Sequence, residues 1–115
     1  MKSQLVKNYG NNQVELQKKF AKIKEQIDKR SLEIEDMTFA ATSSDKSIEV
    51  VVKGDKSLSE IKIINEKLLS AESKEMLQDL IVVTANEAFS KVDKFTDDEI
   101  SKITKDLPNL PGLGF

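Results

Sequence analysis

Six basic residues lie within one short stretch near the start of the chain, "LQKKFAKIKEQIDKR": Lys18, Lys19, Lys22, Lys24, Lys29 and Arg30. Lysine side chains bind phosphates as mobile point charges, without reading base sequence and with a strong dependence on salt. The same charges also suit a solvated helix face, because Glu15, Glu25 and Asp28 are interspersed among them. From these residues alone the solvated face is the simpler interpretation, and phosphate binding is the sharper hypothesis.

Four more lysines lie nearer the C-terminus and are candidates for an additional phosphate-binding surface: Lys91, Lys94, Lys102 and Lys105. Acids interspersed among them weaken that hypothesis: Asp93, Asp97, Asp98, Glu99 and Asp106. The run Thr96-Asp97-Asp98-Glu99 matches a capping box, and predicts either a short third helix or a kinked continuation of the second. Acids in a first helical turn oppose the positive end of the helix, so no metal site is predicted there.

The residue inventory excludes most catalytic chemistry. The 115 residues include no Cys and no His, which removes disulfides, thiolate zinc sites and the usual general base near neutral pH. A phosphate cradle needs several glycines before a helix, whereas Gly54 stands alone between two strand-like runs. We therefore expect a protein that is not an enzyme and has no cofactor.

Charge is distributed unevenly along the chain, although the formal net charge is only −2. Residues 1–30 carry eight Lys or Arg against three acids, and residues 31–115 carry ten Lys against seventeen acids. The basic first segment favours nucleic acid or another acidic partner, while the acidic total argues mildly against nucleic acid. Neither a signal peptide nor a membrane span is predicted, so we expect a soluble cytoplasmic protein.

A long helix must position the first cluster of lysines. After polar residues 1–12, with Gly10-Asn11-Asn12 as a breaker, the pattern becomes helical from about Gln13 to Glu35. Its apolar seam, in which Arg30 fills one position, consists of Leu16, Phe20, Ile23, Ile27 and Ile34. One short domain does not easily cover so long a stripe, so we expect a second copy of the chain to pack on it. The candidates for this dimer interface are Leu16, Phe20, Ile23 and Ile27.

Three strands are predicted next, at residues 37–42, 47–53 and 58–64. The second strand alternates, with Ile48, Val50 and Val52 on one face. The turns are short, which forces neighbouring strands to be antiparallel and predicts a three-stranded meander with one apolar face to cover. Gly54 is expected in the second turn because a tight turn often needs a positive φ.

A second long helix is predicted from Lys74, with Ser73 as its N-cap, to about Phe95. The end of the chain, "PNLPGLGF", contains two prolines and two glycines, which exclude regular structure. The expected fold class is α+β. The expected organisation is a flexible extension at residues 1–12, a single α-β-β-β-α domain at residues 13–107 and a Pro/Gly-rich tail at residues 108–115.

Several stretches in this order resemble the YbaB/EbfC family of bacterial nucleoid-associated proteins. "LQKKFAKIKEQIDK" is similar to the family's first helix, and "SIEVVVKGDKSLSEIKIINEKLL" looks like its central strands. "SKEMLQDLIVVTANEA" is similar to its second helix, and "LPGLGF" to its end. The chain departs from the family at the first strand turn, which is "SSDK" rather than glycine-rich, and at Asn65-Glu66, where the family has Asp-Pro.

The resemblance implies a homodimer with projecting helices that binds duplex DNA in the nucleoid, with little sequence preference and no enzymatic activity. It also moves the interpretation of the basic helix toward contact with phosphates. A protein-interaction scaffold that does not itself bind DNA tightly remains the alternative, with a DNA repair or replication protein as its partner. The acidic total charge favours that alternative.

Overall fold

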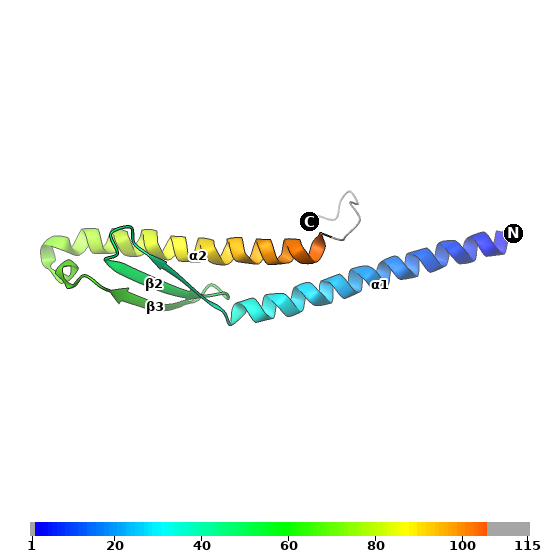
Figure 1. Ribbon diagram of the computed structural model, residues 1–115, viewed down its shortest axis with the longest axis horizontal. Coiled ribbons are helices and arrows are strands. Elements are labelled where there is room, and N and C mark those ends of the chain that lie inside the picture. The colour runs from blue at the N-terminus through cyan, green and yellow to red at the C-terminus, as the bar shows by residue number, and fades with distance from the viewer. Residues whose placement is uncertain (1, 106–115) are drawn as a thin grey trace.

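The computed structural model describes residues 2–105, with side chains described from Val14 onward (Figure 1). Along the chain, one long helix comes first and another comes last, with a small sheet and two short 3₁₀ helices between them. The elements are α1 (Lys2–Glu35), β1 (Thr38–Thr42), β2 (Ile48–Lys53), β3 (Leu58–Ile63), η1 (Glu66–Leu69), η2 (Ala71–Ser73) and α2 (Lys74–Thr104). The predicted α+β fold is confirmed, whereas the tail at residues 108–115 lies outside the described residues.

The three strands form an antiparallel sheet in the order β1-β2-β3, so the predicted meander is confirmed. Ala41 pairs with Val50, and Val50 pairs with Ile61, which places all three side chains on the same face. The pairing of β2 with β3 shifts between Val51 and Val52. A bulge of this kind bends the strand and increases its local twist.

One face of the sheet packs on α2 and forms the core. Ile48, Val50 and Val52 from β2 are fully buried, together with Ala88 and Val92 from α2. Fully burying each of these valines contributes about 1.5–3 kcal/mol relative to an exposed side chain. Within the sheet, α2 contacts mainly β2 and β1, so it covers these two strands more fully than β3.

The first helix leaves this core as a projecting arm. The molecule measures 84 × 24 × 15 Å and its radius of gyration is 22.9 Å, compared with about 13 Å for a compact chain of this length. Figure 1 shows α1 running past the C-terminal end of α2 and away from the sheet. Ile23 and Ile34 of α1 are buried, and every residue from Val14 to Lys19 is exposed. We call the part of α1 before Phe20 the arm.

The helix bounds differ from the sequence-based expectation at two places. Helix α1 begins at Lys2, so Gly10-Asn11-Asn12 does not end it. Helix α2 continues to Thr104, so the separate third helix at Thr96 is wrong, and of the two predicted alternatives the continuation of the second helix is the one that forms. The capping box does not form there, because the Glu99 carboxylate instead accepts hydrogen bonds from Arg30 and Lys102. The predicted start at Lys74 is confirmed, although Ser73 makes no side-chain cap.

The "SSDK" turn between β1 and β2 forms without a glycine. Lys46 takes the left-handed conformation, with φ of 60°. Asp45 Oδ1 accepts hydrogen bonds from Ser43 Oγ at 2.8 Å and from Ser47 N at 3.1 Å. The bonds from Ser47 and then Ser43 hold the pKa of the Asp45 carboxyl below its ordinary value. An aspartate that caps its own turn replaces the conformational freedom that glycine would provide.

Glycine is needed at position 54 for a different reason from the positive φ that the sequence predicted. Its φ lies outside the left-handed region, and in that turn Lys56 takes the left-handed conformation instead, with φ of 68°. A Cβ atom at Gly54 would lie 1.8 Å from the carbonyl oxygen of Ile34, in the last turn of α1. The Gly54 N–H also donates to the Met37 carbonyl at 2.9 Å. Glycine is required because the β2–β3 turn approaches the backbone of α1 closely.

We predict that Gly54→Ala destabilises the fold, because the added methyl group overlaps a backbone carbonyl that cannot rotate away. The expected loss in the free energy of unfolding is about 1–3 kcal/mol, measured by urea denaturation. Ser44→Ala, in the exposed "SSDK" turn, is the control and should leave the stability nearly unchanged. A Gly54→Ala protein as stable as the parent would show that the close approach is not required.

Candidate nucleic-acid interface

Five of the six predicted basic residues form an exposed lysine set on α1: Lys18, Lys19, Lys22, Lys24 and Lys29. At 3.6 residues per turn, Lys18, Lys22 and Lys29 share one side of the helix, roughly opposite the apolar seam that carries Ile23. Lys24 projects from a different side of the helix, nearer to that seam. Two members, Lys18 and Lys19, belong to the arm, where no residue from Val14 onward is covered by the rest of the chain.

None of these five lysines has an ionic partner among the described residues, a property that they share with most other lysines of the fold. In contrast, Lys56 pairs with Asp93, and Lys62 Nζ lies 3.4 Å from Glu49 Oε1. Intervening acids on α1 therefore do not neutralise the lysine set through direct ion pairs. The ammonium groups remain available to an external anion.

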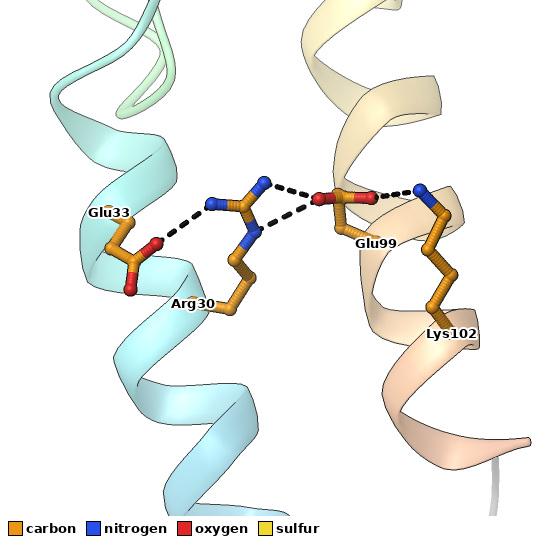
Figure 2. Close-up of polar contacts among 4 residues, drawn as sticks. All are labelled: Arg30, Glu33, Glu99 and Lys102. Atoms are coloured by element: carbon orange, nitrogen blue, oxygen red, sulfur yellow. Dashed lines mark hydrogen bonds and ion pairs between the residues drawn. The ribbon is translucent and has the colours of Figure 1, made fainter.

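Arg30, the sixth predicted residue, lies in a different environment. Its Nε donates to Glu99 Oε1 at 3.0 Å, its Nη2 donates to the same oxygen, and its Nη1 donates to Glu33 Oε2 at 2.8 Å (Figure 2). The guanidinium carbon also lies 5.7 Å from the centre of the Phe95 ring. The structure thus brings Arg30 to α2 and separates it from the lysine set.

The two acids and Lys102 complete an ionic network between the helices (Figure 2). The Glu99 side chain is only 13% exposed, and its Oε2 accepts a hydrogen bond from Lys102 Nζ at 2.7 Å. The Lys102 ammonium and then the Arg30 guanidinium hold the pKa of the Glu99 carboxyl below its ordinary value. Glu99 and then Glu33 raise the pKa of Arg30 in return.

The additional lysine candidates on α2 do not form one free cationic surface. Lys91 Nζ donates to the Ala40 carbonyl at 2.7 Å, and Lys102 is held by Glu99. Lys91 and Lys94 line an open hollow of about 280 Å³ with Phe39, Phe95 and Asp98. Lys105 is exposed at the end of the described chain. Within the described residues, no group of three or more acidic side chains is placed to hold a metal ion.

The predicted dimer candidates on α1 are already partly covered within one chain. Ile23 is 8% exposed, Phe20 and Ile27 are half-buried, and Leu16 is 37% exposed. Other exposed apolar side chains lie on α1 itself, on and after β3 and on α2: Val14, Leu32, Leu58, Ile61, Ile64, Leu69, Met76, Val82 and Val83. Leu58 and Ile61 face the same side of the sheet as the core, but α2 does not extend over them.

Sequence reasoning missed the pairing of Arg30 with Glu99. The available signal was the position of Arg30 within an apolar seam, where the side chain must face the packed side of the helix. No sequence rule identified Glu99 as its partner, because the two residues are 69 positions apart.

In the described residues neither long helix contains a stretch apolar enough to cross a membrane.

Comparison with known proteins gives one consistent result. Residues 10–107 match the model of the YbaB/EbfC DNA-binding family. A nucleoid-associated protein of Ruminiclostridium cellulolyticum is 35% identical over 105 residues, which cover 91% of this chain and 90% of that protein. One from Clostridium acetobutylicum is 38% identical over 104 residues, covering 90% and 91%.

A solved structure shares the fold at low sequence identity. It is an uncharacterized protein of Helicobacter pylori, with a TM-score of 0.61 and 18% identity, and the match covers 73% of this chain and 87% of that one. At this identity the similarity shows the fold alone. The helix-sheet-helix arrangement is therefore found in a distant sequence as well as in this one.

The ionic network predicts a pH dependence of stability. The pKa of Glu99 is lower in the folded chain than its ordinary value of 4.5. Its ion pairs therefore contribute stability above that value and lose it as pH falls through the lower folded pKa. We expect the difference in free energy of unfolding between the parent and Glu99→Gln to shrink below about pH 4.5, measured by urea denaturation across pH. Glu87→Gln, at an exposed site on α2, is the control and should show no such change, and a gap independent of pH would contradict the prediction.

Proposed function

The chain belongs to the YbaB/EbfC DNA-binding family, and we propose that it binds duplex DNA in the nucleoid as a non-catalytic homodimer. The observation that carries this proposal is the exposed lysine set of α1, which has no ionic partner among the described residues. The nucleoid-associated relatives from Ruminiclostridium and Clostridium support the same function.

The lysine set suits a phosphate backbone better than a base edge. Each ammonium group is a mobile point charge with three donors, and binding releases counterions from the DNA. Lys18, Lys22 and Lys29 follow one flank of α1 over about 16 Å, which spans several phosphates along a DNA strand. The proposed contacts are therefore electrostatic and fall steeply in strength as salt rises.

Limited sequence preference follows from the same chemistry. Phosphate contacts fix position and orientation but do not distinguish base pairs, whereas base reading needs side chains placed against the base edges in a groove. The one arginine of α1 is engaged with Glu33 and Glu99. A lysine set that contacts phosphates adds no base contact of its own, which supports binding with little sequence preference.

The exposed apolar residues support the homodimer. Leu58 and Ile61 are 52% and 38% exposed, although both face the core side of the sheet. Exposed apolar side chains gathered next to a core are typical of an interaction surface. A second copy that packs on this surface would complete the cover that α2 provides mainly over β1 and β2. The homodimer would also present two lysine sets to one duplex.

A protein-interaction scaffold is the second candidate function, and the same apolar surface favours it. In that case the occupant of β3 would be a different protein, such as one in DNA repair or replication. Dimerisation in solution and DNA binding by the isolated protein separate the two candidates. A monomer that binds no DNA would favour the scaffold.

We predict that changing Lys18, Lys19 and Lys22 together to Glu abolishes a gel shift with duplex DNA at low salt. Affinity falls with salt on a log–log plot, and each phosphate that a lysine neutralises steepens that fall by about 0.9. The variant should therefore show a shallower dependence on salt than the parent. The measurement is a salt titration of binding to two unrelated duplexes of equal length, which the parent should bind with similar affinity.

The matched control for the lysine variant carries the same charge change elsewhere. Lys46, Lys67 and Lys74 are exposed and lie far from α1 in sequence, so changing all three to Glu tests net charge alone. The control should lose much less affinity than the α1 variant. Equal loss in both proteins, or no binding by the parent at low salt, would contradict the proposed interface.

We predict that Ile61→Glu converts the homodimer to a monomer, because it places a charge in the apolar surface of β3. Light scattering should give twice the 12.9 kDa chain mass for the parent and the single mass for the variant. Thr38→Glu is the control, since Thr38 lies on the other face of the sheet opposite Lys53. A parent that is monomeric at micromolar concentration would refute the homodimer.

A further inference from the structure

We propose that Arg30 is a positioning residue that fixes the direction of the DNA-binding arm, rather than a ligand of the DNA phosphate. The inference rests on the proposed function for its link to DNA, whereas the direction of the arm can be measured without DNA. The observation that carries it is the ionic bridge from Arg30 on α1 to Glu99 on α2 (Figure 2).

All three nitrogen atoms of the Arg30 guanidinium group donate to carboxylate oxygens. The side chain is 30% exposed, and its face lies over the Phe95 ring. A phosphate would have to replace Glu99, whose carboxylate is part-buried and already at bonding distance. The lysine set faces no such competition among the described residues. The arginine is thus engaged within the chain.

Glu99 is suited to hold the bridge. Its side chain is 13% exposed, and both carboxylate oxygens accept hydrogen bonds, from Arg30 and from Lys102. Charge-assisted hydrogen bonds with little access to water are stronger and less screened than surface ion pairs. Helix α2 packs on the sheet through Ala88 and Val92, so Glu99 presents a fixed point to α1.

A second fixed point lies one helical turn further along α1. The carbonyl oxygen of Ile34 abuts Gly54 in the β2–β3 turn, with room for a hydrogen atom but not for a methyl group. Arg30 and Ile34 are about 6 Å apart along the helix axis. Two contacts to different elements, α2 and the sheet, restrict the direction in which α1 leaves the body.

A helix converts a small change at its base into a large displacement of its free end. Lys18 lies about 18 Å from Arg30 along the axis, so a tilt of roughly 10° moves it by about 3 Å. Such a displacement is comparable to the length of a hydrogen bond. In a homodimer, the direction of each arm would also set the spacing between the two lysine sets, and therefore the stretch of duplex that both contact.

The test compares two changes of equal chemistry with different geometry. Glu99→Gln and Glu33→Gln each remove one negative charge from a partner of Arg30. Glu99 lies on α2, so its bond with Arg30 joins the two helices. Glu33 lies on α1 itself and cannot fix α1 relative to the body. If Arg30 were a phosphate ligand, both changes would raise DNA affinity, because both release the guanidinium and add net positive charge.

The positioning role predicts the opposite sign for Glu99→Gln. We expect it to lower DNA affinity by roughly fivefold, the low end of coupling between sites, while Glu33→Gln does not lower it. Arg30→Gln should also lower affinity, although it changes the net charge in the other direction. Arg30→Lys keeps the charge but not the fork geometry, and should lose affinity too. Increased affinity in Glu99→Gln, or full retention in Arg30→Lys, would overturn the proposal.

The direction of the arm is measured directly with spin labels. The chain has no Cys, so Gln17→Cys on α1 and Ser90→Cys on α2 provide one labelled pair at exposed sites. With labelled chain diluted in unlabelled chain, the distance distribution should broaden or shift in Glu99→Gln and Arg30→Gln but not in Glu33→Gln. Identical distributions in all proteins would overturn the positioning role. Failure of the parent to bind DNA would contradict the proposed function alone.

Discussion

The packing of one long helix on a much shorter sheet is the constraint from which the rest of the molecule follows. Helix α2 has 31 residues and each of β2 and β3 has six, which correspond to about 46 Å of helix and about 20 Å of strand. Part of α2 therefore extends beyond the sheet and must find another neighbour. The C-terminal half of α1 supplies it, with Ile23 and Ile34 buried. On β3, Ile63 packs against the core, whereas Leu58 and Ile61 stay exposed.

The two ends of α1 consequently have different tasks. From Phe20 to Glu35, one side of α1 contacts the body of the protein and the other side faces solvent. The contacting side includes Ile23, Ile27 and Arg30, which bridges to Glu99. Residues from Val14 to Lys19 make no such contacts and are exposed on all sides. One continuous helix joins these regions, and its hydrogen-bonded backbone transmits the orientation of the anchored half to the free half.

The sequence is informative where local pattern decides structure. Alternation in "SIEVVVK" predicts β2 and its buried face within one residue, and the predicted start of α2 at Lys74 is correct. The predicted end of α2 is wrong because Thr96 to Glu99 match a local capping signal, while Glu99 is in fact recruited by a residue 69 positions away. Gly54 shows the same limit. Its backbone neighbour in α1 cannot be read from the turn's own residues. The lysine set is identifiable by type and spacing, whereas its lack of ion pairs among the described residues depends on the fold.

The contrast between the Arg30–Glu99 bridge and the lysine set has a consequence for the proposed binding to DNA. Exposed ammonium–phosphate contacts weaken steeply with ionic strength because counterions compete for them. The Arg30–Glu99 bridge is part-buried, and the Gly54–Ile34 contact involves backbone atoms without net charge. The proposed lysine–phosphate contacts are therefore more sensitive to ionic strength than the contacts that hold α1 on the body of the protein. If DNA binds as proposed, a rise in salt that detaches the protein would leave the arm preorganised for the next duplex, so rebinding would require diffusion alone and no refolding of the interface.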